Sequence, residues 1–159
     1  MAFGFRRPFQ PKGDNRFLIN LGDRERAVVR TVCEELIGML DDPAAGPLLR
    51  RVYPVGHASD AGIDAAYQEL VHEDLATSRR ANLELIVATA ADTELDRAQL
   101  DTWMVGLTTV RLVLGTRLGV TEDGRRELEP DDEDLVAHAV YEFLGGIVES
   151  IVRSLASTL

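Results

Sequence analysis

The chain has 159 residues, of which 45% are hydrophobic and 28% charged, so it is long and apolar enough to form a single globular domain over residues 1–159. Its single cysteine excludes an internal disulfide framework and a cysteine-rich zinc site. It has no long uncharged apolar run and no apolar signal segment near its N-terminus, which predicts a cytoplasmic protein that does not span a membrane.

Charge is distributed unevenly along the chain. The net charge is −10, but residues 1–30 carry seven basic and three acidic side chains, so this segment is +4 and the remainder is −14. Non-specific affinity for nucleic acid comes mostly from neutralising phosphates, so only the N-terminal segment is a candidate DNA-binding surface. We predict that its basic residues bind a partner: Arg6, Arg7, Lys12, Arg16, Arg24, Arg26 and Arg30.

Residues 1–21 predict a β-hairpin arm. Apolar residues alternate along the two short runs that flank the turn sequence Pro-Lys-Gly-Asp. Pro8 cannot donate a backbone hydrogen bond, so the first strand is expected at a sheet edge. Four of the five phenylalanines lie here, and the pattern predicts that Phe5, Phe9 and Phe17 pack against one another or cover helices.

Beyond the arm, apolar residues recur at helical spacing. The first helix is predicted over residues 23–41, capped by Gly22 or Asp23 and stopped by Pro43. A long helical region follows over residues 60–91, and its polar middle could kink or break it. The segment between these helices is predicted to be a short turn and a loop.

Two further helices complete the pattern. Asp96 and Gln99 have the spacing of a capping box, and the helix that they begin is predicted to end near Leu118. The last helix, over residues 131–157, is apolar around more than one face, which indicates a central helix or a second face for a partner, including a second copy of the chain. The fold class is therefore all-α: a bundle of four to five helices over residues 22–159, with the small N-terminal hairpin.

Candidate metal ligands occur in two pairs. Glu69 and His72 form an E-x-x-H pair, and Asp134 and His138 lie one helical turn apart. A di-iron bundle needs two E-x-x-H pairs and two further glutamates, and most of that set is missing. We therefore predict no metal or other cofactor, and keep a metal-dependent helical-bundle oxidoreductase only as an alternative.

No catalytic motif is present. The sequence has no nucleophile elbow, phosphate-binding loop or dinucleotide-binding glycine pattern. Cys33 lies on the apolar stripe of the first helix, where a thiol is typically buried and inert; as a nucleophile it would need an adjacent base. The sequence predicts a non-enzymatic protein, with Cys33 as its sole candidate redox residue.

Two glycines and one arginine stand out in the third predicted helix. Gly115 and Gly119 near its end predict a close helix contact or a C-terminal cap. Arg111 lies among apolar residues and is expected either to extend to the surface or to pair with a buried carboxylate. The candidate partners are Glu34, Glu142 and Glu149.

Four segments, in order, resemble one family: ERAVVRTVCEELIGMLDD, LLRRVYP, LDTWMVGLTTVRLVLGTRLGV and YEFLGGIVESIVRSL. They are similar to an actinobacterial family long catalogued as a domain of unknown function. Its genes lie beside that of the ClpS proteolytic adaptor and near cysteine-biosynthesis genes, and members are described as AosR-type oxidative-stress transcriptional regulators. The more specific parts are IGMLDD and the W-x(7)-R-L-x-L-G pattern that contains Trp103, Arg111 and Gly115, and they look like packing motifs.

The resemblance implies a cytoplasmic, non-enzymatic regulator that acts with a sigma factor or at promoter DNA. The redox switch proposed for the family needs two cysteines, and this chain has only Cys33. An internal disulfide is therefore excluded, and an intermolecular one would require Cys33 to be exposed. Gene neighbourhood in the family gives a further alternative, an interaction partner in ClpS-linked proteolysis.

Overall fold

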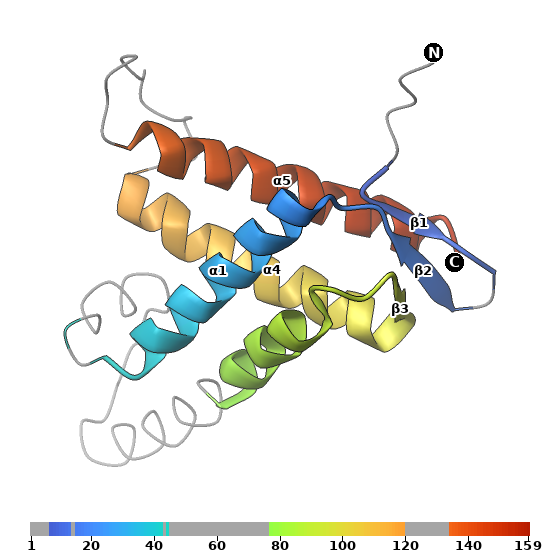
Figure 1. Cartoon of the computed structure of the whole chain (residues 1–159), viewed down its shortest axis with the longest axis horizontal. Coiled ribbons are helices and arrows are strands. Elements are labelled where there is room, and N and C mark those ends of the chain that lie inside the picture. Colours follow the sequence, from blue (N-terminus) through green and yellow to red (C-terminus); the bar gives the residue numbers. More distant parts are fainter. Residues whose placement is uncertain (1–6, 14, 43, 45–76, 120–133) are drawn as a thin grey trace, which may run out of the picture.

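The structure is a computed structural model that describes residues 7–13, 15–42, 44, 77–119 and 134–159. Helices predominate and a small antiparallel sheet packs at one end (Figure 1), which confirms the predicted fold class. The elements are β1 (Phe9–Pro11), β2 (Arg16–Ile19), α1 (Asp23–Leu40), a helix over residues 77–89, β3 (Glu94–Asp96), α4 (Arg97–Leu118) and α5 (Leu135–Ala156).

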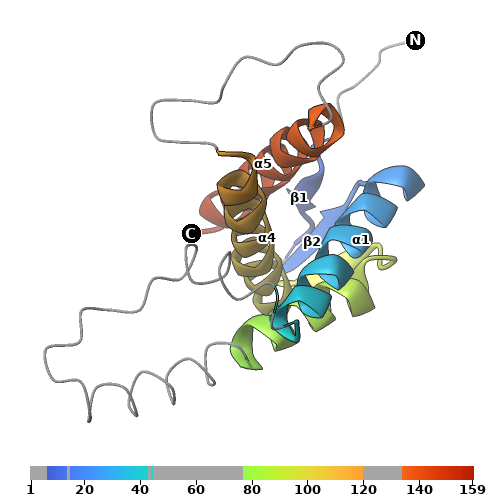
Figure 2. The same cartoon turned by 90° about the vertical axis from the view of Figure 1, so that its left-hand side faces the viewer.

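Helix α4 is the central helix of the described part. It contacts α5 along its length, and it also contacts α1, β2 and β3. Figures 1 and 2 show α4 and α5 side by side in both views, with the strands beside the C-terminal half of α5. The apolar breadth of α5 therefore does not reflect a central position.

The sheet contains the predicted hairpin and one strand that the sequence did not predict. β1 pairs antiparallel with β2, with Phe9 opposite Ile19. β2 also pairs antiparallel with β3, with Phe17 opposite Leu95, so the strand order is β1-β2-β3. The predicted two-stranded arm is thus a three-stranded sheet with β1 at an edge, as the proline argument required. β3 was missed because a three-residue strand has too few positions to show alternation.

The outer edge of β1 is covered by α5. The Phe9 amide donates to Ser150 Oγ at 3.1 Å, and the Ser154 hydroxyl donates to the Phe9 carbonyl at 2.9 Å. The Phe9 ring meets Trp103 edge-to-face, with ring centroids 5.7 Å apart. Phe9 and Phe17 are completely buried, which confirms that they cover the helices, whereas Phe5 lies outside the described residues. This part of the arm is folded against the core.

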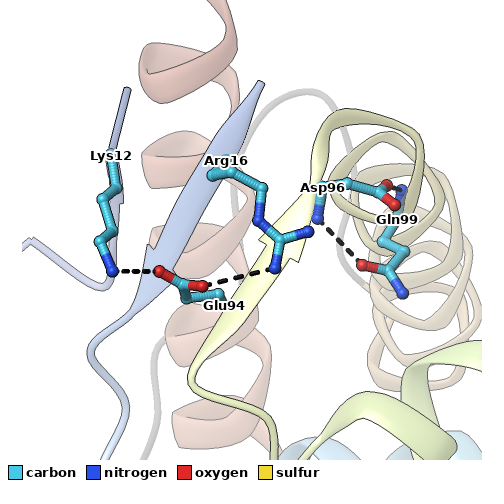
Figure 3. A network of polar contacts seen from close by, with 5 residues as sticks. All are labelled: Lys12, Arg16, Glu94, Asp96 and Gln99. Carbon is cyan, nitrogen blue, oxygen red and sulfur yellow. Dashed lines mark hydrogen bonds and ion pairs between the residues drawn. The ribbon is translucent and has the colours of Figure 1, made fainter. Parts of the chain in front are cut away.

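The helix ends follow from local sequence. Gly22 is the N-cap of α1, and its amide donates to Glu25 Oε1 at 3.0 Å. The predicted capping box at α4 is confirmed: the Gln99 amide donates to Asp96 Oδ1 at 2.8 Å, and the Asp96 amide donates to Gln99 Oε1 at 2.9 Å (Figure 3). Gly119 ends α4 with a φ of 73°, a left-handed conformation that favours glycine.

Other predicted segments are partly described. α1 ends at Leu40, one residue before the expected end, and α4 ends at Leu118 as expected. Of the long helical region predicted over residues 60–91, residues 77–89 are helical and the part before residue 77 lies outside the described residues. The turn and loop predicted between the first two helical regions also fall outside them.

The hydrogen bond between Ser154 and Phe9 gives a first test. Replacing Ser154 by alanine leaves the buried Phe9 carbonyl without its side-chain donor. We expect S154A to lower the free energy of unfolding by about 1–2 kcal/mol, measured by urea denaturation. The control is S78A at an exposed helix position, which should stay within about 0.5 kcal/mol of wild type. Equal stability of S154A and S78A would contradict this role.

Candidate partner-binding surface

Two of the predicted binding residues gather around one carboxylate at the hairpin. Figure 3 shows Lys12 and Arg16 directed at Glu94 of β3. Lys12 Nζ lies 2.5 Å from Glu94 Oε1, and Arg16 Nη2 lies 3.4 Å from Glu94 Oε2. The hydrogen bonds from Lys12 and then Arg16 hold the pKa of the Glu94 carboxyl below its usual value. Both basic side chains remain at least half exposed, so these pairs add little stability but reduce the local positive charge.

Arg26 is used inside the protein. Its Nε donates to the Leu21 carbonyl at 2.9 Å, and its Nη2 donates to the Ile19 carbonyl at 3.1 Å. Its Nη1 donates to the carbonyls of Ala90 at 2.9 Å and Asp92 at 2.6 Å. One guanidinium therefore ties the end of β2 and the start of α1 to the segment before β3. Sequence reasoning did not find this role, because nothing in the local pattern distinguishes Arg26 from its basic neighbours.

The remaining basic residues lie apart from one another. Arg24 lines a hollow between α1 and α5, whereas Arg30 lines, with Arg26, a different hollow beside residues 91 and 93. Arg7 is exposed just before β1, and Arg6 lies outside the described residues. The structure thus separates the predicted binding residues into several sites.

An apolar hollow lies between α1 and α5. Its apolar lining is Val28, Val136, Ala139, Val140 and Phe143, and Arg24 and Glu25 form its polar rim. Val136 is 75% exposed, and the neighbouring Leu135 is 41% exposed. We call this the α1–α5 groove. It contains part of the surplus apolar surface that the sequence of the last helix indicated.

The family-specific pattern in α4 forms internal contacts. Trp103 is buried, and its Nε1 donates to Thr89 Oγ1 at 2.8 Å. Gly115 faces α5, where a Cβ would lie 2.9 Å from a ring carbon of Tyr141. Gly115 thus permits a close helix contact, one of the two alternatives from its sequence, and Gly119 satisfies the other as the helix cap.

Arg111 is half-buried, and its partner among the described residues is not a carboxylate. Its guanidinium carbon lies 4.1 Å from the centre of the Tyr141 ring, and its Nε donates to the Tyr141 carbonyl at 3.4 Å. Among the described residues no carboxylate forms an ion pair with it, so none of the three candidate glutamates is the partner. The π face of a residue 30 positions away takes that place.

Cys33 is completely buried in the core. Burial, with a smaller contribution from the charge of Glu34, raises the pKa of its thiol to about 12. A thiol in this position is not accessible to a second chain, and it carries almost no thiolate near neutral pH.

The candidate metal ligands do not form a centre in the described part of the chain. Glu69 and His72 lie outside the described residues. His138 is buried, and neither ring nitrogen has a hydrogen-bond partner among the residues that the structure describes. No group of three or more His, Cys, Asp or Glu side chains that could hold a metal occurs among residues 77–119, 134–159 and the described N-terminal segments.

Helix α5 has the length and composition of a membrane span. Within the described ranges it is the one helix long and apolar enough to cross a membrane, with a mean hydropathy of 1.5. Core helices of folded domains meet the same criterion, so this is weak evidence for a span. α5 packs on α4 and β1 in the structure.

The fold and its surface define a class: a small, mainly helical domain with an apolar groove and dispersed basic residues. The chain belongs to the family described as a domain of unknown function, DUF2017, whose model matches residues 6–155. No curated protein and no solved structure matches the chain.

The internal role of Arg26 predicts an effect on stability. Methionine at this position keeps much of the aliphatic volume but leaves the carbonyls at residues 19, 21, 90 and 92 without their donor. We expect R26M to lose about 2–3 kcal/mol in urea denaturation. R30M removes the same charge one turn further along α1, from an exposed position, and should change stability by less than about 0.5 kcal/mol. Equal losses in both variants would show that the charge, and not the hydrogen bonds, is responsible.

The environment of Cys33 predicts an unreactive thiol. Because the pKa is raised to about 12, little thiolate is present at mildly alkaline pH, and burial blocks the reagent. We expect iodoacetamide to label Cys33 in guanidinium chloride but not in the native protein, as followed by intact mass. C33A supplies the unlabelled reference. Native labelling at the denatured rate would contradict the buried assignment.

Proposed function

We propose that the protein is a non-enzymatic regulator that binds another protein through the α1–α5 groove. The observation that carries this proposal is exposed apolar surface at the start of α5, with Val136 three-quarters exposed beside a polar rim of Arg24 and Glu25. An apolar centre with a charged rim is the usual composition of a protein–protein interface. The partner that suits it is an amphipathic helix that places apolar side chains in the groove.

Protein contacts are favoured over DNA contacts by the distribution of charge. Of the basic residues that could meet phosphates, Lys12 and Arg16 share Glu94, and Arg26 is occupied by backbone carbonyls. The rest of the chain is strongly acidic. Three of the predicted basic residues are thus engaged by other groups of the described part, which reduces the positive surface that could neutralise phosphates, the main source of non-specific DNA affinity.

The resemblance noted from the sequence suggests a more specific form of the proposal. The chain resembles AosR-type oxidative-stress transcriptional regulators, so a sigma factor is the proposed partner, and the cytoplasm is the proposed location. Burial of Cys33 argues against a thiol switch at that residue, so regulation in this chain runs through binding rather than through its own oxidation.

The test measures binding of purified wild-type protein to RNA polymerase core enzyme, to sigma factors and to ClpS from the same organism, and to its operon's promoter DNA at low salt. We expect binding to a sigma factor. We expect V136D to weaken it at least about tenfold, because a carboxylate in the groove must be desolvated. V105D is the matched control: it puts the same charge on an exposed valine of α4 that does not line the groove.

Four outcomes would contradict the proposal. Binding to neither polymerase components nor promoter DNA removes the regulatory role, and binding to ClpS alone favours the proteolysis pathway. Equal affinities of V136D and wild type would show that the groove is not the binding site. A second copy of the chain is the competing occupant, so sedimentation of both variants at several concentrations accompanies the assay; a dimer that V136D dissociates would assign the groove to self-association.

A further inference from the structure

The Arg111 side chain of α4 packs against α5. One face of its guanidinium lies over the Tyr141 ring, and its Nε donates to the Tyr141 carbonyl. The absence of a side chain at Gly145 makes this possible, because a Cβ there would lie 2.9 Å from Arg111 Nε and 3.0 Å from Nη2. Arg111 is thus ordered by α5 without having its charge neutralised there.

The polar donors at this contact are incompletely used. In the described part of the chain, neither Nη atom of Arg111 makes a hydrogen bond, and no carboxylate pairs with it. The Tyr141 hydroxyl, which lies beside Gly115, also has no hydrogen-bond partner there. A guanidinium remains charged at all ordinary pH values, and its Nη edge matches the two oxygens of a carboxylate.

Arg111 and Tyr141 are among the residues that line a hollow of about 220 Å³ between α4 and α5. Its other walls include apolar groups of Leu112 and Val148, and Thr108 and Thr116 at its margins. Both threonine hydroxyls donate to carbonyls of their own helix, at 2.6 Å and 2.8 Å, so they add little donor capacity. The hollow therefore combines one cation and one hydroxyl with an apolar wall.

We propose that this hollow binds the carboxylate of a small ligand with a compact apolar body. The carboxylate would accept hydrogen bonds from Arg111 Nη and the Tyr141 hydroxyl, and the apolar part would contact Leu112 and Val148. Glu149, one turn beyond Gly145 on α5, is paired with Arg153 at 2.6 Å. The site is separate from the α1–α5 groove, since no residue lines both, and it does not depend on the proposed regulatory role.

The test is an NMR titration with isovalerate, whose branched body suits the hollow, followed at the backbone amides of Gly115 and Gly145. We expect saturable shifts with a Kd of roughly millimolar order, as befits a fragment of this size. Isovaleramide, the uncharged analogue, should give no saturable shift at the same concentrations. Identical titrations with isovalerate and isovaleramide, or no saturable shift with isovalerate, would overturn the proposal.

Three variants assign the contacts. We expect R111Q to weaken isovalerate binding at least about tenfold through loss of a charge-assisted pair. R117Q removes the same charge from α4, but Arg117 lines a hollow on the α1 side, so the affinity should change less than about twofold. Equal weakening in R111Q and R117Q would overturn the site in favour of general electrostatics.

The third variant remains informative even if R111Q fails to fold. Y141F keeps the ring under Arg111 and removes only the hydroxyl, so the backbone spectrum should be preserved and the affinity should fall about threefold or more. If Y141F and wild type bind isovalerate equally, the proposed carboxylate position is wrong.

Discussion

The fold depends on the contacts of one buried indole. Trp103 of α4 donates to Thr89 in the preceding helix, and its ring receives Phe9 of β1. Segments from the start and the middle of the chain therefore meet at a single side chain. The strand that carries Phe9 is too short to be stable by itself. Its outer backbone groups are satisfied by Ser150 and Ser154 of α5, so the N-terminal sheet exists because α4 and α5 supply both an apolar surface and hydrogen-bond partners.

This dependence changes how the N-terminal charges should be read. In the sequence the basic residues form one positive segment on an acidic protein, which suggests a single binding surface. Once the sheet forms, β3 brings Glu94 between Lys12 and Arg16, and the turn into α1 directs Arg26 at four carbonyls. Lys12, Arg16 and Arg26 thus interact with carboxylate and carbonyl oxygens that folding brings next to them. Apolar surface on α5 becomes the stronger indication of a partner than the basic residues are.

What the sequence could predict was local. The Asp96–Gln99 box and the glycine cap of α4 depend on residues within one turn, and the hairpin depends on a turn sequence between two alternating runs. What it could not predict was non-local. β3 is defined only by its pairing with β2, and the acceptors of Arg26 come from three separate places in the chain. For Arg111 the sequence indicated carboxylates as candidate partners, whereas the observed partner is the ring face of Tyr141. Helical periodicity does not distinguish Tyr141 from an ordinary core residue.

Helix α5 explains why binding and folding need not conflict in so small a protein. Its C-terminal half holds the sheet through Ser150 and Ser154, and its middle contacts Arg111 through Tyr141 and Gly145. The exposed apolar side chains Leu135 and Val136 lie in its first turn, where they contribute little to the core. A helix used only for packing would not need apolar residues there, because exposed positions at a helix start are better filled by polar or acidic side chains. The exposed first turn of α5 lies before the turns that contact Arg111 and the sheet, so Val136 can vary without loss of the contacts that fold the chain.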